Sequence, residues 1–223
     1  MSDLSTGIEI LDSRLDGGVP EGTVISLVAH PMSMGELFLE QLALTRPTYY
    51  FTNTRPSEAV RESVESLDPD TISDYIEKED DEDSESHRLE MVDLSPTEVG
   101  MGDYTDSVSD LLLGTLEDID GTDSDENKSH NIVFDSFSEY VRNDDGYRKV
   151  LRGIQEHIYE TSGLACLYIT KGDRPLTRDE EYVLGVSDVV FHLTTDTDGD
   201  NVENRLAVPK IRNADPPDET IKL

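Results

Sequence analysis

The chain has 223 residues, of which 50 are acidic and 18 basic, so its formal net charge is −32. This length suits one α/β domain with a substantial core. The absence of any basic cluster argues against nucleic-acid binding. No apolar stretch approaches the roughly 20 residues of a membrane span, and we find no signal-peptide pattern, so we expect a cytoplasmic protein. The single cysteine, Cys166, excludes a disulfide framework.

The acidic residues indicate the environment in which the protein works. Asp (28 residues) outnumbers Glu (22), and only six of the basic residues are Lys. Apolar runs such as 24–28 and 164–169 argue against global disorder, so the acids belong to the surface of a folded domain. An acid-rich, Lys-poor surface keeps proteins soluble in molar salt. We interpret the chain as a halophilic, archaeal-type protein; the alternative is an ordinary acidic protein.

The first half of the chain alternates helix-type and strand-type patterns. Apolar residues at helical spacing followed by a Gly pair predict a short helix within 6–18. Pro56 opens a later helical pattern. The expected elements are, in order, that helix, a turn at 19–22, a strand at 23–29, a helix ending near Leu44, a strand at 48–54 and a helix at 56–67.

Acidic insertions interrupt the pattern in the middle of the chain. Seven of the nine residues from 77 to 85 are acidic, which predicts a mobile insertion at about 68–88. A second acidic insertion is expected at about 117–130. The other expected elements are a strand at 89–94, a helix at 104–119, a strand at 131–137, a helical pattern at 138–161 broken near 143–146, a strand at 164–170 and a helix at 178–184.

The last part of the chain predicts antiparallel pairing. Two strand-type runs flank the turn D-T-D-G-D-N, which is typical of a hairpin. Residues 220–223 are expected to add an edge strand. Strands that alternate with helices predict a mostly parallel sheet covered on both faces. We therefore expect one α/β domain over residues 1–223, with a C-terminal antiparallel hairpin.

The stretch 23–44 has the pattern of a phosphate-binding loop, in which a strand enters a tight turn that opens a helix. A working loop reads G-x-x-x-x-G-K-[ST]; its Lys neutralises the phosphates and its hydroxyl holds Mg²⁺. On that spacing His30 stands at the first Gly, and Gly35 is kept. Glu36 replaces the Lys, and Leu37 replaces the Ser or Thr. The sequence predicts the scaffold of a nucleotide site without its chemistry.

Four stretches in the right order carry a family resemblance. The motif T-G-I-x-x-L-D-x-x-L-x-G-G-V-P-x-G-T begins at Thr6, and Asp135-Ser136 closes an apolar strand. S-D-V-V-F-H-L follows at 187–193, and R-L-A-V-P-K-I-R at 205–212. Together they resemble the KaiC/RadA branch of the RecA superfamily, which are hexamer-forming ATPases of circadian clocks, recombination and archaeal signalling. The resemblance implies a RecA-like three-layer α/β/α fold.

The departures from that family concern catalysis. The family places two acids after the second strand, in a stretch resembling F-E-E-S-P-E-E, where they prepare the attacking water. Here the stretch reads T-N-T-R-P-S-E, so Asn53 and Thr54 stand in their place and neither can act as a general base. Since Glu36 and Leu37 also remove the Lys and the hydroxyl, we expect no catalytic residue.

Each residue of the degenerate site has two interpretations. Asp135 either holds Mg²⁺ or caps the next helix, and Gly35 either cradles a phosphate or supplies a permissive backbone angle. Met32 and Met34 either plug the vacated cradle or pack within the loop. The five His residues share no metal-ligand spacing, so no metal site is expected. The degenerate nucleotide site comprises His30, Pro31, Met32, Ser33, Met34, Gly35, Glu36, Leu37 and Asp135.

Lys210 and Arg212 form a candidate inter-subunit pair. Two residues apart on a strand, they project from one face, and Pro209 indicates an edge strand. In the resembling family a K-x-R at this place reaches the γ-phosphate of the neighbouring subunit. The alternative is a solvated cationic pair.

These observations favour a catalytically inactive RecA/KaiC-like protein with a regulatory or scaffolding role in signal transduction. Its expected partners are proteins, including an active relative in a ring or further copies of itself. No cofactor is expected. ATP with Mg²⁺ would be a cofactor only if the degenerate site still binds nucleotide. One alternative is an ATPase with an unconventional loop, for which Arg55 is the nearest substitute cation in the sequence. A second is a recombination accessory factor, which the lack of a basic loop disfavours.

Overall fold

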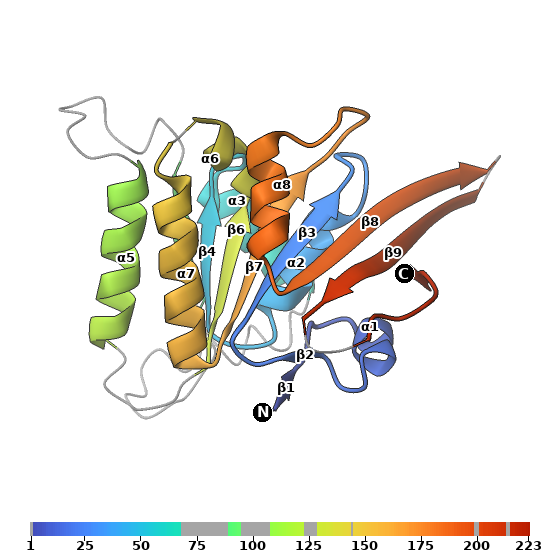
Figure 1. Cartoon of the computed structure of the whole chain (residues 1–223), viewed down its shortest axis with the longest axis horizontal. Helices are drawn as coiled ribbons and strands as arrows, with labels where there is room; N and C mark the ends of the chain where they lie inside the picture. Colours follow the sequence, from blue (N-terminus) through green and yellow to red (C-terminus); the bar gives the residue numbers. More distant parts are fainter. Residues whose placement is uncertain are drawn as a thin grey trace.

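The computed structural model shows a three-layer molecule in which helices cover both faces of a central sheet (Figure 1). This arrangement confirms the predicted α/β fold with a mostly parallel sheet and a C-terminal hairpin. The structure describes residues 2–67, 89–94, 108–122, 129–143, 145–198, 201–212 and 215–223. The expected acidic insertion at 68–88 lies outside these residues.

The central sheet has eight strands in the order β10-β9-β8-β3-β7-β6-β4-β5. The six strands from β8 to β5 run parallel, whereas β9 is antiparallel to β8 and β10 is antiparallel to β9. The carboxyl ends of the parallel strands therefore meet at one edge. The strands are β3 (Thr23–Ala29), β4 (Thr48–Thr52), β5 (Leu89–Asp93), β6 (Asn131–Asp135), β7 (Leu164–Thr170), β8 (Val189–Asp198), β9 (Asn201–Ile211) and β10 (Ile221–Lys222).

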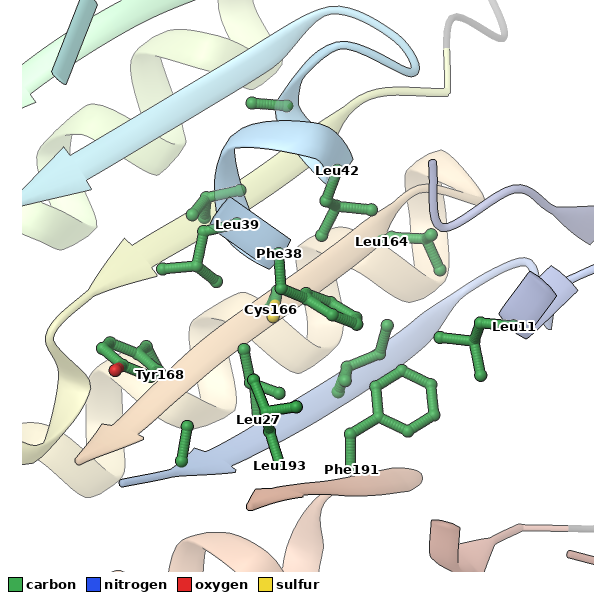
Figure 2. Packing of buried hydrophobic residues seen from close by; sticks show 14 of the residues in the cluster. Leu11, Leu27, Phe38, Leu39, Leu42, Leu164, Cys166, Tyr168, Phe191 and Leu193 are labelled. Atoms are coloured by element: carbon green, nitrogen blue, oxygen red, sulfur yellow. The ribbon is translucent and has the colours of Figure 1, made fainter. Parts of the chain in front are cut away.

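One face of the sheet packs against α1 (Glu9–Arg14), α2 (Gly35–Ala43) and α3 (Ser57–Leu67). Every residue of β3 is buried, and its side chains alternate between the two faces. Figure 2 shows this core, where Phe38 of α2 lies over β7 beside Cys166. Phe38 also meets Phe191 of β8, with ring centroids 5.6 Å apart.

The other face packs against four helices that form the second core cluster. These helices are α5 (Val108–Thr122), α6 (Phe137–Asn143), α7 (Tyr147–Thr161) and α8 (Arg178–Val186). The break between α6 and α7 confirms the predicted interruption near 143–146. α5 continues to Thr122, so its last turns occupy the start of the second predicted acidic insertion.

A buried carboxylate fixes the amino end of α8. Thr177 and Glu180 form a reciprocal capping box. The fully buried Glu180 carboxylate also accepts bonds from Arg174 at 2.6 and 2.8 Å and from Arg142 at 3.2 Å. Burial opposes ionisation of Glu180, but the bonds from Arg174 and Thr177 outweigh it and lower the pKa to about 2. This carboxylate joins α6, α8 and the loop after β7.

The chain ends differ partly from the sequence prediction. β10 pairs with Arg205 and Leu206 of β9, which confirms the predicted edge strand. Pro209 lies beyond that pairing and beside a register shift between β8 and β9, as an edge proline would. The segment predicted as a turn at 19–22 instead contains β2 (Val19–Pro20), which pairs with β1 (Asp3–Leu4).

Candidate functional site

The loop between β3 and α2 is held by its own hydrogen bonds. The amide and the hydroxyl of Ser33 both donate to the carbonyl oxygen of His30, at 2.8 and 2.6 Å. The amide of Met32 donates to Nδ1 of His30 at 3.1 Å. His30, which stands at the first Gly of the expected pattern, therefore shapes the turn with its backbone and its ring.

Met32 and Met34 do not fill a cradle. The side chain of Met32 is 82% exposed and that of Met34 is 48% exposed. The interpretation of these residues as a hydrophobic plug is therefore wrong, because neither is buried beneath the loop.

Gly35 lies against the ring of Tyr168. A Cβ atom at Gly35 would come 2.7 Å from the Tyr168 hydroxyl and 2.8 Å from its Cε2. Figure 2 shows Tyr168 near the carboxyl end of β7. Gly35 does not have a positive φ, so its backbone angle does not require a glycine. The close packing against Tyr168 does require one. Burial raises the pKa of Tyr168 to about 12, with Asp135 and Glu36 adding to the shift.

An arginine occupies the centre of the site. The guanidinium of Arg55, from the turn after β4, lies 3.0 Å from Glu40, 3.4 Å from Asp135 and 3.5 Å from Glu36. Its Nη2 also donates to the hydroxyl of Tyr50 at 3.5 Å. Burial opposes the charge of Arg55, yet Tyr50, Glu40 and Asp135 outweigh it and raise the pKa. We call Glu36, Glu40, Asp135 and Arg55 the Arg55 cluster.

The Arg55 cluster carries more negative than positive charge. Three carboxylates surround one guanidinium, and two of them, on Glu40 and Asp135, are nearly inaccessible to solvent. Sequence analysis missed Glu40, although it lies four residues after Glu36 and so on the same face of α2. The sequence does contain a signal for Glu40, because it is an acidic residue within the apolar stripe of a helix.

Asp135 ends β6 and is 1% exposed. Its carboxylate accepts bonds of 3.4 Å each from Tyr50, Thr54 and Arg55. Burial raises its pKa, and Arg55 opposes that rise. No amide of α6 donates to this carboxylate among the described hydrogen bonds, so the interpretation as a helix cap is wrong.

Asn53 and Thr54, which stand at the expected acid positions, bind the end of β6. The side chain of Asn53 accepts from the amide of Ser136 at 2.8 Å and donates to its carbonyl at 3.1 Å. Thr54 donates to Asp135. These contacts hold the end of β4 and the end of β6 together.

Lys210 and Arg212 lie away from the loop and contact the carboxyl end of α8. The ammonium of Lys210 donates to the carbonyls of Leu184 and Gly185 at 3.0 and 2.9 Å. Arg212 donates to the carbonyl of Val186 at 3.2 Å and pairs with Asp188 at 2.6 Å. Both side chains reach the same helix end, as expected for residues on one face.

Two histidines far apart in sequence form a buried contact that sequence analysis missed. Nε2 of His130 lies 2.7 Å from Nε2 of His157, and both residues are at most 4% exposed. No sequence spacing signals this pair, because His130 precedes β6 and His157 lies on α7. Among the described residues, no group of three or more His, Cys, Asp or Glu is placed to hold a metal. Nor is any helix in that part of the chain long and apolar enough to cross a membrane.

Comparison with known proteins gives a family and a fold. Residues 3–223 match a family described as "Family of unknown function (DUF7125)". The chain belongs to this family. A search of curated proteins gave no match. The DUF7125 chain is similar to the crystal structure of a KaiC-like protein from the hyperthermophilic archaeon Pyrococcus horikoshii OT3, with a TM-score of 0.70 at 15% identity over 99% of this chain and 94% of that one.

The structural likeness supports the RecA/KaiC-like fold that the four sequence stretches implied. At 15% identity the likeness concerns the fold alone. The DUF7125 match covers nearly the whole chain, including both the loop after β3 and the C-terminal hairpin.

Proposed function

We propose that this protein is a catalytically inactive member of the RecA/KaiC-like fold that acts through protein–protein contacts, with a regulatory or scaffolding role in signal transduction. The observation that carries the proposal is the Arg55 cluster. Arg55, a cation beside the degenerate loop, is engaged by Glu36, Glu40 and Asp135, so it is not free to neutralise phosphates.

The net negative charge of the Arg55 cluster opposes the binding of a polyphosphate. Three carboxylates and one guanidinium leave an excess of negative charge beside the loop. Two like charges about 4 Å apart repel by roughly 4 kcal/mol at an effective dielectric constant of about 20. A bound nucleotide would add further anions at the first turn of α2, where Glu36 stands.

Other parts of a phosphoryl-transfer site are also replaced. Leu37 offers no oxygen to Mg²⁺, and Asn53 and Thr54 are engaged with the end of β6. These contacts support a structural use of the sheet edge in place of a catalytic one.

One observation favours the second candidate, an ATPase with an unconventional loop. That candidate needs a cation from another segment to replace the missing Lys, and Arg55 does reach the side chain of Glu36 at 3.5 Å. To serve a nucleotide, Arg55 would have to leave the buried carboxylate of Glu40 and the buried carboxylate of Asp135.

Calorimetry with ATP and Mg²⁺ in molar KCl separates the two candidates. We expect no binding heat and no turnover for the unmodified protein. Glu36→Lys alone should not restore turnover, while Glu36→Lys with Leu37→Thr should recover nucleotide binding through the rebuilt phosphate and Mg²⁺ contacts. Glu58→Lys, which makes the same charge change on α3, is the control and should not bind. ATPase activity of the unmodified protein that Asp135→Ala abolishes would overturn the proposal.

A further inference from the structure

The β8–β9 hairpin extends past the rest of the sheet (Figure 1). The pairing of β3 with β8 ends at Ala29 and Leu193, whereas β8 continues to Asp198. We call Thr194–Asp198 of β8 with Asn201–Arg205 of β9 the hairpin arm. Its two strands pair with each other along this whole length.

The two edges of the hairpin arm differ. On the β9 side, β10 pairs with Arg205 and Leu206, and the amide of Leu223 donates to the carbonyl of Asn204 at 3.0 Å. On the β8 side, no strand of the described part of the chain pairs with Thr194–Asp198. Within the described residues, the backbone donors and acceptors on this side of β8 therefore have no partner strand.

Such an edge is a template for another strand. A two-stranded ribbon is marginally stable by itself, and proteins protect exposed edges with Lys, Pro or a covering segment. The β8 edge reads Thr-Thr-Asp-Thr-Asp, so its charges are acids and it has neither Lys nor Pro. These acids repel an acidic strand and attract a basic one.

The pairing register of the hairpin arm places two like charges opposite each other. Asp196 lies directly opposite Glu203, and like charges at opposite positions destabilise a strand pair. Glu203 is compensated by Lys222 at 2.7 Å and Arg205 at 3.0 Å. Asp196 makes no ion pair with any described residue. A cation is thus missing on the β8 side of this rung, next to the open edge.

We propose that the β8 edge of the hairpin arm binds an extended segment of a partner protein that carries Lys or Arg at alternate positions. The segment adds a strand to β8 by main-chain hydrogen bonds, and one of its cations meets Asp196. A second copy of the same edge is a poor occupant, because it would bring further acids against Asp196. This inference deepens the proposed function by giving the chemistry of the partner.

The test uses a synthetic peptide of about ten residues, a typical strand length, that alternates Lys and Thr. The peptide is titrated into the full protein, and binding is monitored by NMR amide exchange. Molar KCl is used because it screens non-specific attraction to the acidic surface. One control peptide replaces Lys by Glu. The other keeps the side chains but carries N-methyl groups along one edge, which removes half of its main-chain donors.

We expect the Lys peptide to slow amide exchange within Thr194–Asp198 and to bind about tenfold more tightly than either control, a difference of about 1.4 kcal/mol. Asp196→Lys should abolish the preference for Lys over Glu, while Glu156→Lys on α7 should keep it. Equal binding of the N-methylated peptide, protection elsewhere on the surface, or self-association through this edge without peptide would overturn the inference. Nucleotide binding by the unmodified protein would overturn the proposed function and leave this result unaffected.

Discussion

The guanidinium of Arg55 lies 3.0 Å from the carboxylate of Glu40, a residue of α2 that is 4% exposed. This contact joins the turn after β4 to the helix that follows the degenerate loop. It also means that Arg55, which lies beside the loop, is committed to a buried acid of its own chain.

Removal of Arg55 should therefore destabilise the protein. Arg55→Leu leaves Glu40 and Asp135 buried without their cation, and breaking such a pair costs about 3 kcal/mol. Glu36→Gln should change stability by less than about 1 kcal/mol, since the Glu36 side chain is 53% exposed. Urea unfolding of both variants in molar KCl measures the difference. Equal effects would mean that the cluster does not stabilise the site.

Gly35 should not tolerate even one added methyl group. Gly35→Ala places Cβ 2.7 Å from the Tyr168 hydroxyl, and such overpacking costs about 1–3 kcal/mol. Gly114→Ala is the matched control, because a Cβ there meets nothing within 4 Å in the middle of α5, and the change should stabilise by about 0.5–1 kcal/mol. Thermal unfolding compares them. A neutral Gly35→Ala would show that Tyr168 moves aside freely.

Acid unfolding should depend on Glu180. Its pKa is about 2 in the folded chain against an ordinary value of 4.5, so the folded state binds fewer protons than the unfolded state between these values. The stability that this group supplies is complete above pH 4.5 and is lost as the pH falls toward 2. Glu180→Gln should thus be less stable at neutral pH and lose less on acidification.

The control for Glu180 is its exposed neighbour Glu181. Glu181→Gln should unfold with the same pH dependence as the unmodified chain, as measured by circular dichroism from pH 7 to pH 2. A Glu180→Gln curve that runs parallel to the unmodified one would contradict the assignment.

Lys210 and Arg212 should stabilise the carboxyl end of α8, whose own last turn has no basic residue. Lys210→Met with Arg212→Met removes the donors to three terminal carbonyls and should cost about 1 kcal/mol, with faster amide exchange in that turn. Arg205→Met, on the same strand, is the control. If the double variant leaves α8 unchanged, the pair is free for the inter-subunit role that the sequence resemblance implied.

Salt should decide whether the chain folds. A charge of −32 on 223 residues repels itself unless ions screen it. We expect cooperative unfolding in molar KCl and a much lower melting temperature, or loss of structure, near 0.1 M. Equal stability at both concentrations would contradict the halophilic interpretation.

The sequence predicted an element best where the spacing of apolar residues and the positions of Gly and Pro determine its bounds. The strand at 164–170 was predicted to the residue, because an apolar run of strand length follows Gly163. β1 and β2 were missed, since two-residue strands carry no period. α5 outlasts its predicted end because Glu117 and Asp118 lie on the exposed face of this helix instead of in a loop.

The sequence predicted where the candidate site lies but not which side chains contact one another there. The loop, Asp135 and the missing Lys were read from spacing. The burial of Glu40 and the contact between His130 and His157 depend on segments that meet only in the folded chain. The same holds for Lys210, whose carbonyl partners Leu184 and Gly185 lie 26 and 25 residues away in sequence.

The earliest helix and the last strand of the chain share one core. Ile221 of β10 and Leu11 of α1 belong to the same buried cluster, and α1 contacts β10 (Figure 1). During synthesis on the ribosome, α1 emerges well before β10 and cannot complete its packing until Ile221 has left the exit tunnel. The order of translation therefore delays the closure of this corner until β10 has emerged, and emergence of the first half of the chain alone cannot complete this core.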